Sequence, residues 1–272
     1  MDHITSYEPV EQPGDVFLLP AYCPIPGFGV LPMHSMLIRG AQPMLIDTGP
    51  RAASEAFLER LSRLVDLDDL RWVWITHADP DHVGALGAVL ERAPAARVVT
   101  TFMGLGKLGL LGLVPPERAY LLNPGQRLDL GDRELIGLRP PLYDAPETLA
   151  AFDSRTRALF AADAFGALLD TPAEDAGAIA RAALRRGMLA WAGVDAPWLE
   201  HLPRSALASA LGELRRLGCH HLYGAHLPPA HDLGDVLADV LMEACGAPPF
   251  VGPDQRALLA SGPRAAAAPP GV

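Results

Sequence analysis

Four potential metal ligands lie within six consecutive residues of this 272-residue chain: His77, Asp79, Asp81 and His82. The apolar run at 72–75 before them is typical of a buried strand, and apolar residues at helical spacing follow at 83–90. Side chains between a strand and a helix converge at one edge of a sheet. Asp81 could instead cap the helix, but capping leaves the other three residues unexplained. Because imidazoles and carboxylates are common ligands of transition metals, the cluster predicts a metal site.

The same residues carry a resemblance to a known family. After a strand and Thr76, His77-Ala-Asp-Pro-Asp-His82 resembles the His-x-(His/Glu/Asp)-x-Asp-His signature of the metallo-β-lactamase superfamily. The resemblance extends over about residues 16–245. It implies an α/β fold, a four-layer αββα sandwich, formed by a single domain at 1–261. It also implies two metal ions, bound by residues from four segments of the chain.

The resemblance supplies the other ligands. Asp163, in Ala-Asp-Ala-Phe-Gly, matches the aspartate that bridges the metals, and His226, in Gly-Ala-His-Leu-Pro-Pro, matches the last histidine. The remaining ligand is normally a histidine before the bridging aspartate, but that region has none, and Asp144 or, alternatively, Tyr143 occupies its place. The expected ligands are therefore His77, Asp79, Asp81, His82, Asp144, Asp163 and His226. Among these, Asp81 and Asp163 are also expected to be catalytic.

Three further residues are expected near the metals without binding them directly. By the resemblance, Asp47 in Asp-Thr-Gly lies below the metals as a hydrogen-bond acceptor, although the residues alone would indicate an ordinary strand-end turn. His34 is expected either to contact the substrate or to be a satisfied core histidine. Tyr143, if it is not a ligand, remains a candidate for the surroundings of the site.

The ligand set predicts which metals bind. Four aspartates carry a formal charge of −4, which balances two divalent ions. An oxygen-rich, anionic set favours iron or manganese over zinc. It also weakens the acidity of metal-bound water. We therefore expect two metal ions per chain, with iron favoured and manganese or zinc as alternatives.

The leading functional expectation is a dinuclear metal hydrolase. A hydroxide between the metals would attack an acyl carbonyl of a small molecule, and one metal would stabilise the oxyanion. Because no further general acid stands beside the ligands, a thioester or activated ester is favoured as the substrate. A non-enzymatic metal-dependent binding or sensor protein is a third reading.

The rival expectation is an oxygen- or nitric-oxide-reactive di-iron redox protein. The carboxylate-rich ligand set supports it, and the segment from Asp163 to Gly166 resembles the flavodiiron branch of the superfamily. In that branch a flavodoxin domain follows the metal domain. This chain is expected to end before such a domain, so the redox reading needs a separate electron donor.

The surrounding pattern alternates strands with helices, which predicts sheets covered by helices. A helix is predicted at 51–64, a helical insertion at about 173–217 and a last helix at 236–244. The Pro- and Gly-rich residues 22–31 indicate a loop. Residues 103–116 are apolar but hold too many glycines for a core helix, so we expect a mobile lid or a buried irregular connection. Strands are predicted at 15–20, 33–38, 44–49, 72–75, 96–101, 120–139, 158–163 and 220–229.

Composition excludes several classes of partner. The net charge is −10 and the 22 basic residues form no cluster, which argues against nucleic acid and anionic membranes. The three cysteines are odd in number and irregularly spaced, which argues against a disulfide framework or a zinc cluster. No signal peptide and no apolar run of about 20 residues is present, so we expect a cytoplasmic protein. Residues 262–272 are rich in Ala and Pro and are expected to be a disordered tail.

Overall fold

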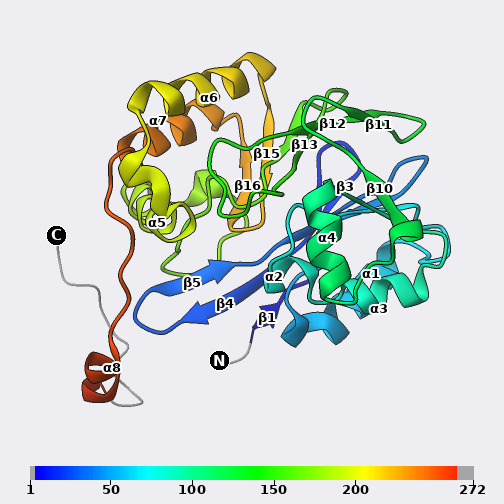
Figure 1. The fold of residues 1–272 in the computed structure, drawn as a ribbon, viewed down its shortest axis with the longest axis horizontal. Helices are drawn as coiled ribbons and strands as arrows, with labels where there is room; N and C mark the ends of the chain where they lie inside the picture. The colour runs from blue at the N-terminus through cyan, green and yellow to red at the C-terminus, as the bar shows by residue number, and fades with distance from the viewer. Residues whose placement is uncertain (1–3, 262–272) are drawn as a thin grey trace.

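Two large β-sheets form the centre of the structure, a computed structural model that describes residues 4–261 (Figure 1). The first sheet has seven strands, in the order β10 (Ala119–Leu121), β9 (Arg97–Thr100), β8 (Trp72–Trp74), β7 (Met44–Ile46), β6 (Ser35–Ile38), β3 (Val16–Leu19) and β2 (Val10–Gln12). The second has six strands, in the order β11 (Arg127–Asp129), β12 (Glu134–Leu138), β13 (Ala150–Asp153), β14 (Ala158–Phe160), β15 (His221–Gly224) and β16 (Leu227–His231).

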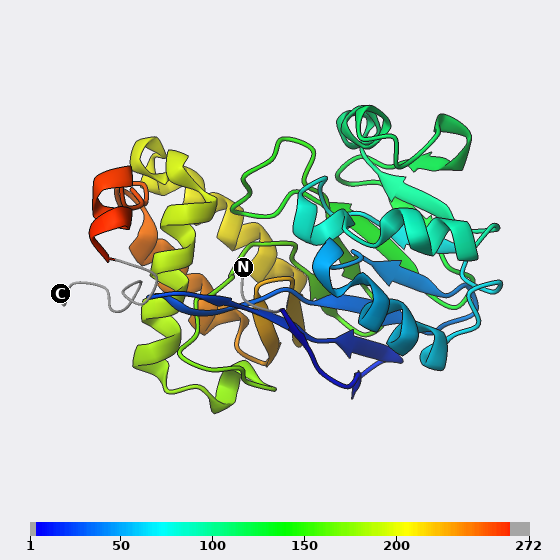
Figure 2. The same ribbon diagram turned by 90° about the horizontal axis from the view of Figure 1, so that it is seen from below.

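Helices cover the outer face of each sheet, so the predicted four-layer αββα sandwich is confirmed (Figure 2). Short 3-10 turns complete the connections. The first sheet is covered by α1 (Ser54–Leu64), α3 (Leu86–Arg92) and α4 (Phe102–Leu110), with the short α2 (Pro80–Val83) between strand and helix. The second is covered by α5 (Arg181–Asp195), α6 (Arg204–Leu217) and α7 (Gly234–Ala244). One more helix, α8 (Gln255–Ser261), follows the helix expected to be the last.

Alternating side chains explain why the strands read as continuous apolar runs. In β3, Val16 and Leu18 lie in the core between the sheets, whereas Phe17 and Leu19 pack with the helices outside. Strand β8 repeats the pattern, since Trp74 faces the inner core and Val73 the outer one. Side chains in a strand point alternately to its two faces, and both faces are buried here. The continuous hydrophobic runs therefore follow from the sandwich.

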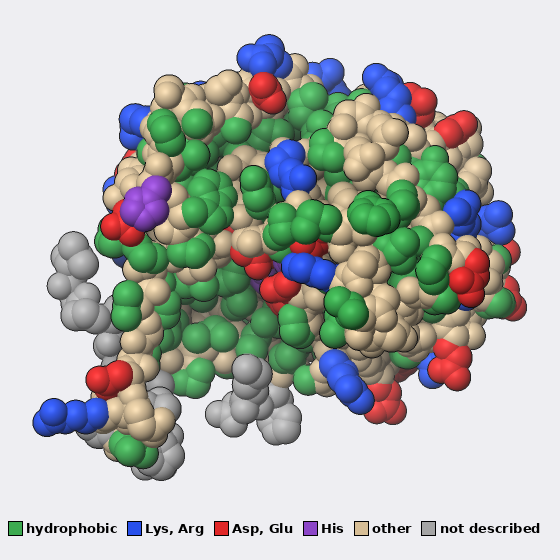
Figure 3. Space-filling model, in the orientation of Figure 1, with side chains coloured by type: hydrophobic (Ala, Val, Ile, Leu, Met, Phe, Trp, Pro, Cys, Tyr) green, Lys and Arg blue, Asp and Glu red, His purple; other side chains and the backbone are tan. Residues whose placement is uncertain are grey.

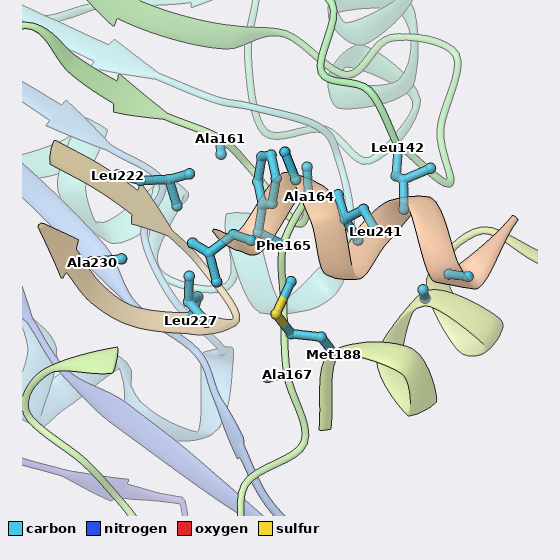
Figure 4. Close-up of a cluster of buried hydrophobic side chains, with 14 of the residues drawn as sticks. Leu142, Ala161, Ala164, Phe165, Ala167, Met188, Leu222, Leu227, Ala230 and Leu241 are labelled. Carbon is cyan, nitrogen blue, oxygen red and sulfur yellow. The ribbon is translucent and has the colours of Figure 1, made fainter. Parts of the chain in front are cut away.

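Phe165 anchors the turn that carries the candidate bridging aspartate. Figure 4 shows its ring among Leu222 and Leu227 of the second sheet and Leu241 of α7, and the residue is 3% exposed. Its φ of 69° lies in the left-handed region, which costs a non-glycine residue about 1–3 kcal/mol. Burying a phenylalanine contributes about 1.5–3 kcal/mol, so packing offsets the strain and holds the turn.

The structure corrects the expectation of a loop at 22–31. These residues belong to an antiparallel hairpin of β4 (Ala21–Ile25) and β5 (Gly29–Pro32), which forms a three-stranded sheet with β1 (Thr5–Ser6). Pro24 is tolerated because β1 pairs with β4 only at Ala21 and Tyr22, which leaves Pro24 with a neighbour on one side alone. Proline is confined to such edge positions because it cannot donate to the ladder.

The glycine-rich segment at 103–116 also differs from the expectation of irregular chain. Most of it forms α4, whose first turn is capped by the Thr101 hydroxyl accepting from the Gly104 N–H at 3.1 Å. Gly104 is required by close packing, because a Cβ there would lie 2.1 Å from Thr100 Oγ1. Leu108 is fully buried in the outer core. Tertiary packing therefore overrides the low helix propensity of glycine, and a lid role for the segment stays a prediction.

The structure also bears on membrane insertion and on the cysteines. Within residues 4–261, no helix is long and apolar enough to cross a bilayer. The tail expected at 262–272 lies outside the described residues. Cys23, Cys219 and Cys245 are all free thiols.

Candidate metal centre

The first ligand segment lies where β8 passes into α2. His77 and Asp79 lie between the strand and the helix, and Asp81 and His82 occupy the first turn of α2. Asp79 takes the N-cap position, but its side chain makes no capping hydrogen bond. The alternative of Asp81 as the helix cap is therefore wrong, since Asp81 lies inside the helix.

Three loops of the second sheet bring the other predicted ligands to the same place. Asp144 lies in the connection from β12 to β13, and Asp163 lies in the turn after β14. His226 lies in the two-residue turn between β15 and β16. The structure therefore brings together all seven residues that the sequence nominated. Their donor atoms form three groups: His77, His82 and Asp163; Asp81, His82 and His226; His77, Asp79 and Asp144.

Asp163 is at the centre of this arrangement. Its Oδ2 lies 3.3 Å from His77 Nε2, and its Oδ1 lies 3.1 Å from His82 Nε2 and 3.3 Å from His226 Nε2. Asp81 Oδ2 is 3.4 Å from His226 Nε2. Asp144 Oδ1 is 3.8 Å from His77 Nε2, the longest of these contacts. One carboxylate thus reaches all three histidines.

The second nitrogen of each histidine is occupied by a different partner. His82 Nδ1 lies 2.9 Å from Asp47 Oδ2, and His226 Nδ1 lies 2.6 Å from the carbonyl oxygen of Pro32. His77 Nδ1 is 3.1 Å from the Thr76 hydroxyl. Such contacts orient metal-binding imidazoles and leave Nε2 for the metal. Asp47 thus lies where the expected hydrogen-bond acceptor should be.

Unpartnered buried atoms test whether these residues fit metal ions. Within residues 4–261, His77 Nε2, His82 Nε2 and Asp163 Oδ1 are buried and have no hydrogen-bond partner despite their proximity. Ligand atoms about 2.0–2.2 Å from a common ion are separated by roughly 3 Å, which agrees with the contacts around Asp163. Buried polar groups are otherwise almost always satisfied. The donors therefore fit a dinuclear metal centre.

The Asp163 carboxylate and the neighbouring imidazoles each stabilise the charged form of the other. Burial opposes the negative charge of Asp163, but the imidazoles of His82, His226 and His77 hold the pKa of its carboxyl well below the usual value. Burial likewise opposes protonation of His226, yet Asp163 raises the pKa of that histidine to about 9. The buried anion thus attracts positive charge, which protons supply in the metal-free protein and cations would supply in the loaded one.

His34 and Tyr143 lie near the centre but outside the donor groups. His34 is 2% exposed and meets the ring of Tyr22 edge-on, and burial lowers its pKa to about 3, so it is neutral. Tyr143 packs against Trp198, with ring centroids 5.5 Å apart. Asp144 shares a donor group with His77 and Asp79.

Sequence reasoning missed one acidic residue of the site. Asp195, the last residue of α5, is 5% exposed and lies with Asp144 and Asp163 in a fourth donor group. Burial and then the charges of Asp163 and Asp144 raise the pKa of Asp195 to about 8 in the metal-free protein. A single aspartate in a helical stretch belongs to no motif, so the sequence held no signal for it.

Trp191, one turn earlier in α5, closes the site on the His226 side. Its ring lies 4.4 Å from the His226 ring, and its indole N–H donates to the Asp163 carbonyl at 3.3 Å. Gly166 allows this approach, because a Cβ there would lie 2.5 Å from the Trp191 ring. On the face shown in Figure 3, acidic side chains gather in a central recess, close to where Figure 1 shows α2.

Comparisons with known proteins agree on one group of relatives. The family model described as "ODP family beta lactamase" matches residues 32–190. "Putative diflavin flavoprotein A 1" of Thermosynechococcus vestitus is 36% identical over 135 residues, 49% of this chain and 24% of that protein. The anaerobic nitric oxide reductase flavorubredoxin of Pectobacterium atrosepticum is 30% identical over 134 residues, 49% of this chain and 26% of that protein.

A solved structure shows the same fold over most of the chain. Rubredoxin oxygen:oxidoreductase of Desulfovibrio gigas superposes with a TM-score of 0.77 at 16% identity, covering 87% of this chain and 61% of that one. The matched region spans about a quarter of the length of the two curated relatives. These names overturn the expectation of an acyl hydrolase acting on a thioester or activated ester, because they denote oxidoreductases.

Proposed function

The chain belongs to the ODP family of beta-lactamase-like proteins, and from that membership we propose that it is a non-haem di-iron protein that reduces dioxygen or nitric oxide. The donor set around Asp163 carries the proposal: unpartnered imidazole nitrogens and carboxylates converge on one buried carboxylate. The oxidoreductases among its relatives support the same chemistry.

The charge of the donors supports iron as the proposed metal. Four aspartates, Asp79, Asp81, Asp144 and Asp163, offset the charge of two divalent ions, and three imidazoles complete the set. Oxygen-rich sites favour ions harder than zinc, and carboxylates also stabilise a higher oxidation state. When bound, iron would supply reversible one-electron chemistry and open positions for a diatomic ligand.

The residues of the chain would divide the binding between two positions. The first metal would be held by His77, Asp79 and Asp144, and the second by Asp81, His82 and His226, with Asp163 shared. The hydrogen bonds of His82 to Asp47 and of His226 to Pro32 fix these rings before a metal arrives. Such fixed ligands keep the geometry of the site while the charge on the metals changes.

The reaction requires electrons and protons from outside the site. Two molecules of nitric oxide take up two electrons and two protons to give nitrous oxide and water. Dioxygen takes up four of each to give two molecules of water. The names of the relatives denote flavoproteins, so we propose a reduced flavin-containing protein as the electron donor, separate from the sandwich of residues 4–261.

Metal analysis followed by turnover measurements tests the function. Protein purified anaerobically from iron-replete cells should contain about two iron ions per chain. Given a chemically reduced flavin, it should consume dioxygen or nitric oxide faster than the flavin alone, with water or nitrous oxide as the product. The Asp163→Ala variant is the control and should show neither iron nor turnover. Iron-loaded protein that consumes neither gas would refute the proposed function.

A further inference from the structure

Asp195 lies against the candidate metal centre although no part of the metal-binding motif contains it. We propose that Asp195 is an eighth metal-binding residue, which coordinates the first metal together with His77, Asp79 and Asp144. The inference rests on the proposed di-iron centre. It adds Asp195, the last residue of α5, which lies beyond residues 32–190 that the family model matches.

The donor atoms place Asp195 beside the first metal rather than the second. One oxygen each from Asp144, Asp163 and Asp195 lie within 4.8 Å of one another. The first two of these residues also approach His77 Nε2, at 3.8 and 3.3 Å. This nitrogen is buried and has no hydrogen-bond partner within residues 4–261. An ion bound to it would therefore lie next to the carboxylates that adjoin Asp195.

The Asp195 carboxyl group is buried and has no direct partner among residues 4–261. Within the described part of the chain, no hydrogen bond or salt bridge reaches this side chain, although the residue is 5% exposed. A buried carboxylate without a partner is unfavourable, and the neighbouring carboxylates add repulsion. A divalent cation among the three carboxylates would relieve both costs, as is usual for buried charges.

The backbone of α5 is held firmly enough to present such a ligand. A Cβ on Gly187 would lie 2.1 Å from the Leu168 carbonyl, so the helix packs directly against that segment. Met188 is fully buried. Trp191, one turn before Asp195, donates to the Asp163 carbonyl at 3.3 Å. The helix end and the bridging aspartate are thus tied to each other.

A fourth carboxylate would also give the first metal a buried ligand beside the partly exposed Asp144. Asp144 Oδ1 lies 3.8 Å from His77 Nε2, and the Asp144 side chain is 32% exposed. Asp195 belongs to the same carboxylate group and is only 5% exposed. Iron and manganese sites often take more than four ligands, and carboxylates supply them. Asp195 would therefore shield the first metal from solvent as well as bind it.

Titration of metal-free protein with Fe²⁺ under anaerobic conditions tests the proposal. Wild-type protein should bind two ions per chain. Asp195→Asn should weaken the binding of one ion at least tenfold, since loss of even an outer partner of a ligand costs about 10–100-fold in affinity. The matched control is Asp170→Asn, because Asp170 is an exposed aspartate whose side chain is 78% accessible. This control should bind both ions as tightly as wild type.

Cobalt spectra distinguish a ligand from a merely nearby carboxylate. The visible absorption of bound Co²⁺ depends on the number of ligands, so Asp195→Asn should change the band of one ion. Weaker binding with a wild-type band would overturn direct coordination, and so would unchanged affinity. Wild-type protein that binds no Fe²⁺ would instead refute the di-iron centre itself. Circular dichroism monitors folding, and Asp195→Ser replaces the asparagine variant if that variant unfolds.

Discussion

Asp163 is the residue on which the candidate centre depends most. It lies within 3.3 Å of the Nε2 atoms of all three histidines, and it occupies a turn held by the buried Phe165. A carboxylate in that position can bind two ions through its two oxygens. Removing Asp163 should therefore affect the binding of both metals, whereas removing any other ligand should affect mainly one.

We expect Asp163→Ala to abolish binding of both metals, because it removes the one ligand common to them. Elemental analysis of the purified variant, beside wild type from the same medium, measures the metal content. Asp170→Ala is the control, since that aspartate is exposed and belongs to none of the donor groups among the described residues. A variant that retained nearly two ions per chain would rule out the bridging role.

Asp144 and Tyr143 compete for one ligand position, and the structure favours the aspartate. Asp144 Oδ1 lies 3.8 Å from His77 Nε2, whereas the Tyr143 ring packs against Trp198 in a tilted arrangement. Asp144→Ala should lower the occupancy of the first metal and spare the second, and Tyr143→Phe should leave both. Metal titration of the two variants decides the matter, and the opposite result would assign the ligand to Tyr143.

Replacement of Asp144 by histidine should change the preferred metal. The substitution removes one negative charge and adds a nitrogen ligand, which moves the site toward the ligand set that zinc prefers. We expect Asp144→His protein to hold a higher ratio of zinc to iron than wild type from the same medium. Elemental analysis gives the ratio, and an unchanged ratio would contradict the argument from charge.

At the scale of elements, α4 is connected to the segment that carries Asp144. Lys107 of α4 places its Nζ 2.6 Å from Oε1 of Glu147, whose side chain is fully buried. The Thr101 hydroxyl, at the cap of α4, also donates to the Glu147 carbonyl at 3.4 Å. The glycine-rich helix thus holds the loop between Asp144 and β13, whether or not it moves as a lid.

Lys107→Met should therefore destabilise the protein by about 2–3 kcal/mol, because it leaves the buried Glu147 carboxylate without its cation. The value lies below that for a fully buried pair because Lys107 is 44% exposed. Arg127→Met is the matched control, since Arg127 and Glu134 form an exposed pair 2.9 Å apart, worth about 0–1 kcal/mol. Urea unfolding measures both, and equal losses would show that burial of Glu147 is unimportant.

On the scale of the whole molecule, the centre joins the two sheets. His77 and His82 follow a strand of the first sheet, whereas Asp144, Asp163 and His226 follow strands of the second. Metals bound between them would crosslink the halves of the sandwich. Stability should therefore depend on the metals as well as on the three apolar cores.

Metal removal should lower the stability of the whole domain. Free Fe²⁺ at about a thousand times its dissociation constant stabilises the folded state by about 4 kcal/mol for each site that forms only on folding. With two such sites and about 2–4 °C for each kcal/mol, the melting temperature should fall by roughly 16 °C or more after chelation. Anaerobic calorimetry with and without chelator measures this. Asp163→Ala protein should not respond, and a wild type equally insensitive to chelation would contradict the prediction.

The sequence by itself determined the features that depend on residues close together in the chain. The ligands from His77 to His82 are recognisable because they lie within one strand-to-helix connection, and α1 is recognisable from the spacing of its apolar residues. The resemblance to a known superfamily nominated Asp163 and His226 as further ligands, and the structure brings both beside these histidines. It did not decide the reaction, since related ligand sets serve hydrolysis and redox chemistry alike.

Tertiary structure alone decided the features that depend on contacts between distant segments. Asp195 reaches Asp144 and Asp163 only because α5 packs beside their loops, and a lone helical aspartate has no local signature. Helix α4 forms despite its glycines because Leu108 is buried and Gly104 fits closely against Thr100. Both features depend on packing between distant segments, which no short stretch of sequence contains. In α4 the free energy of that packing outweighs the low helix propensity of glycine.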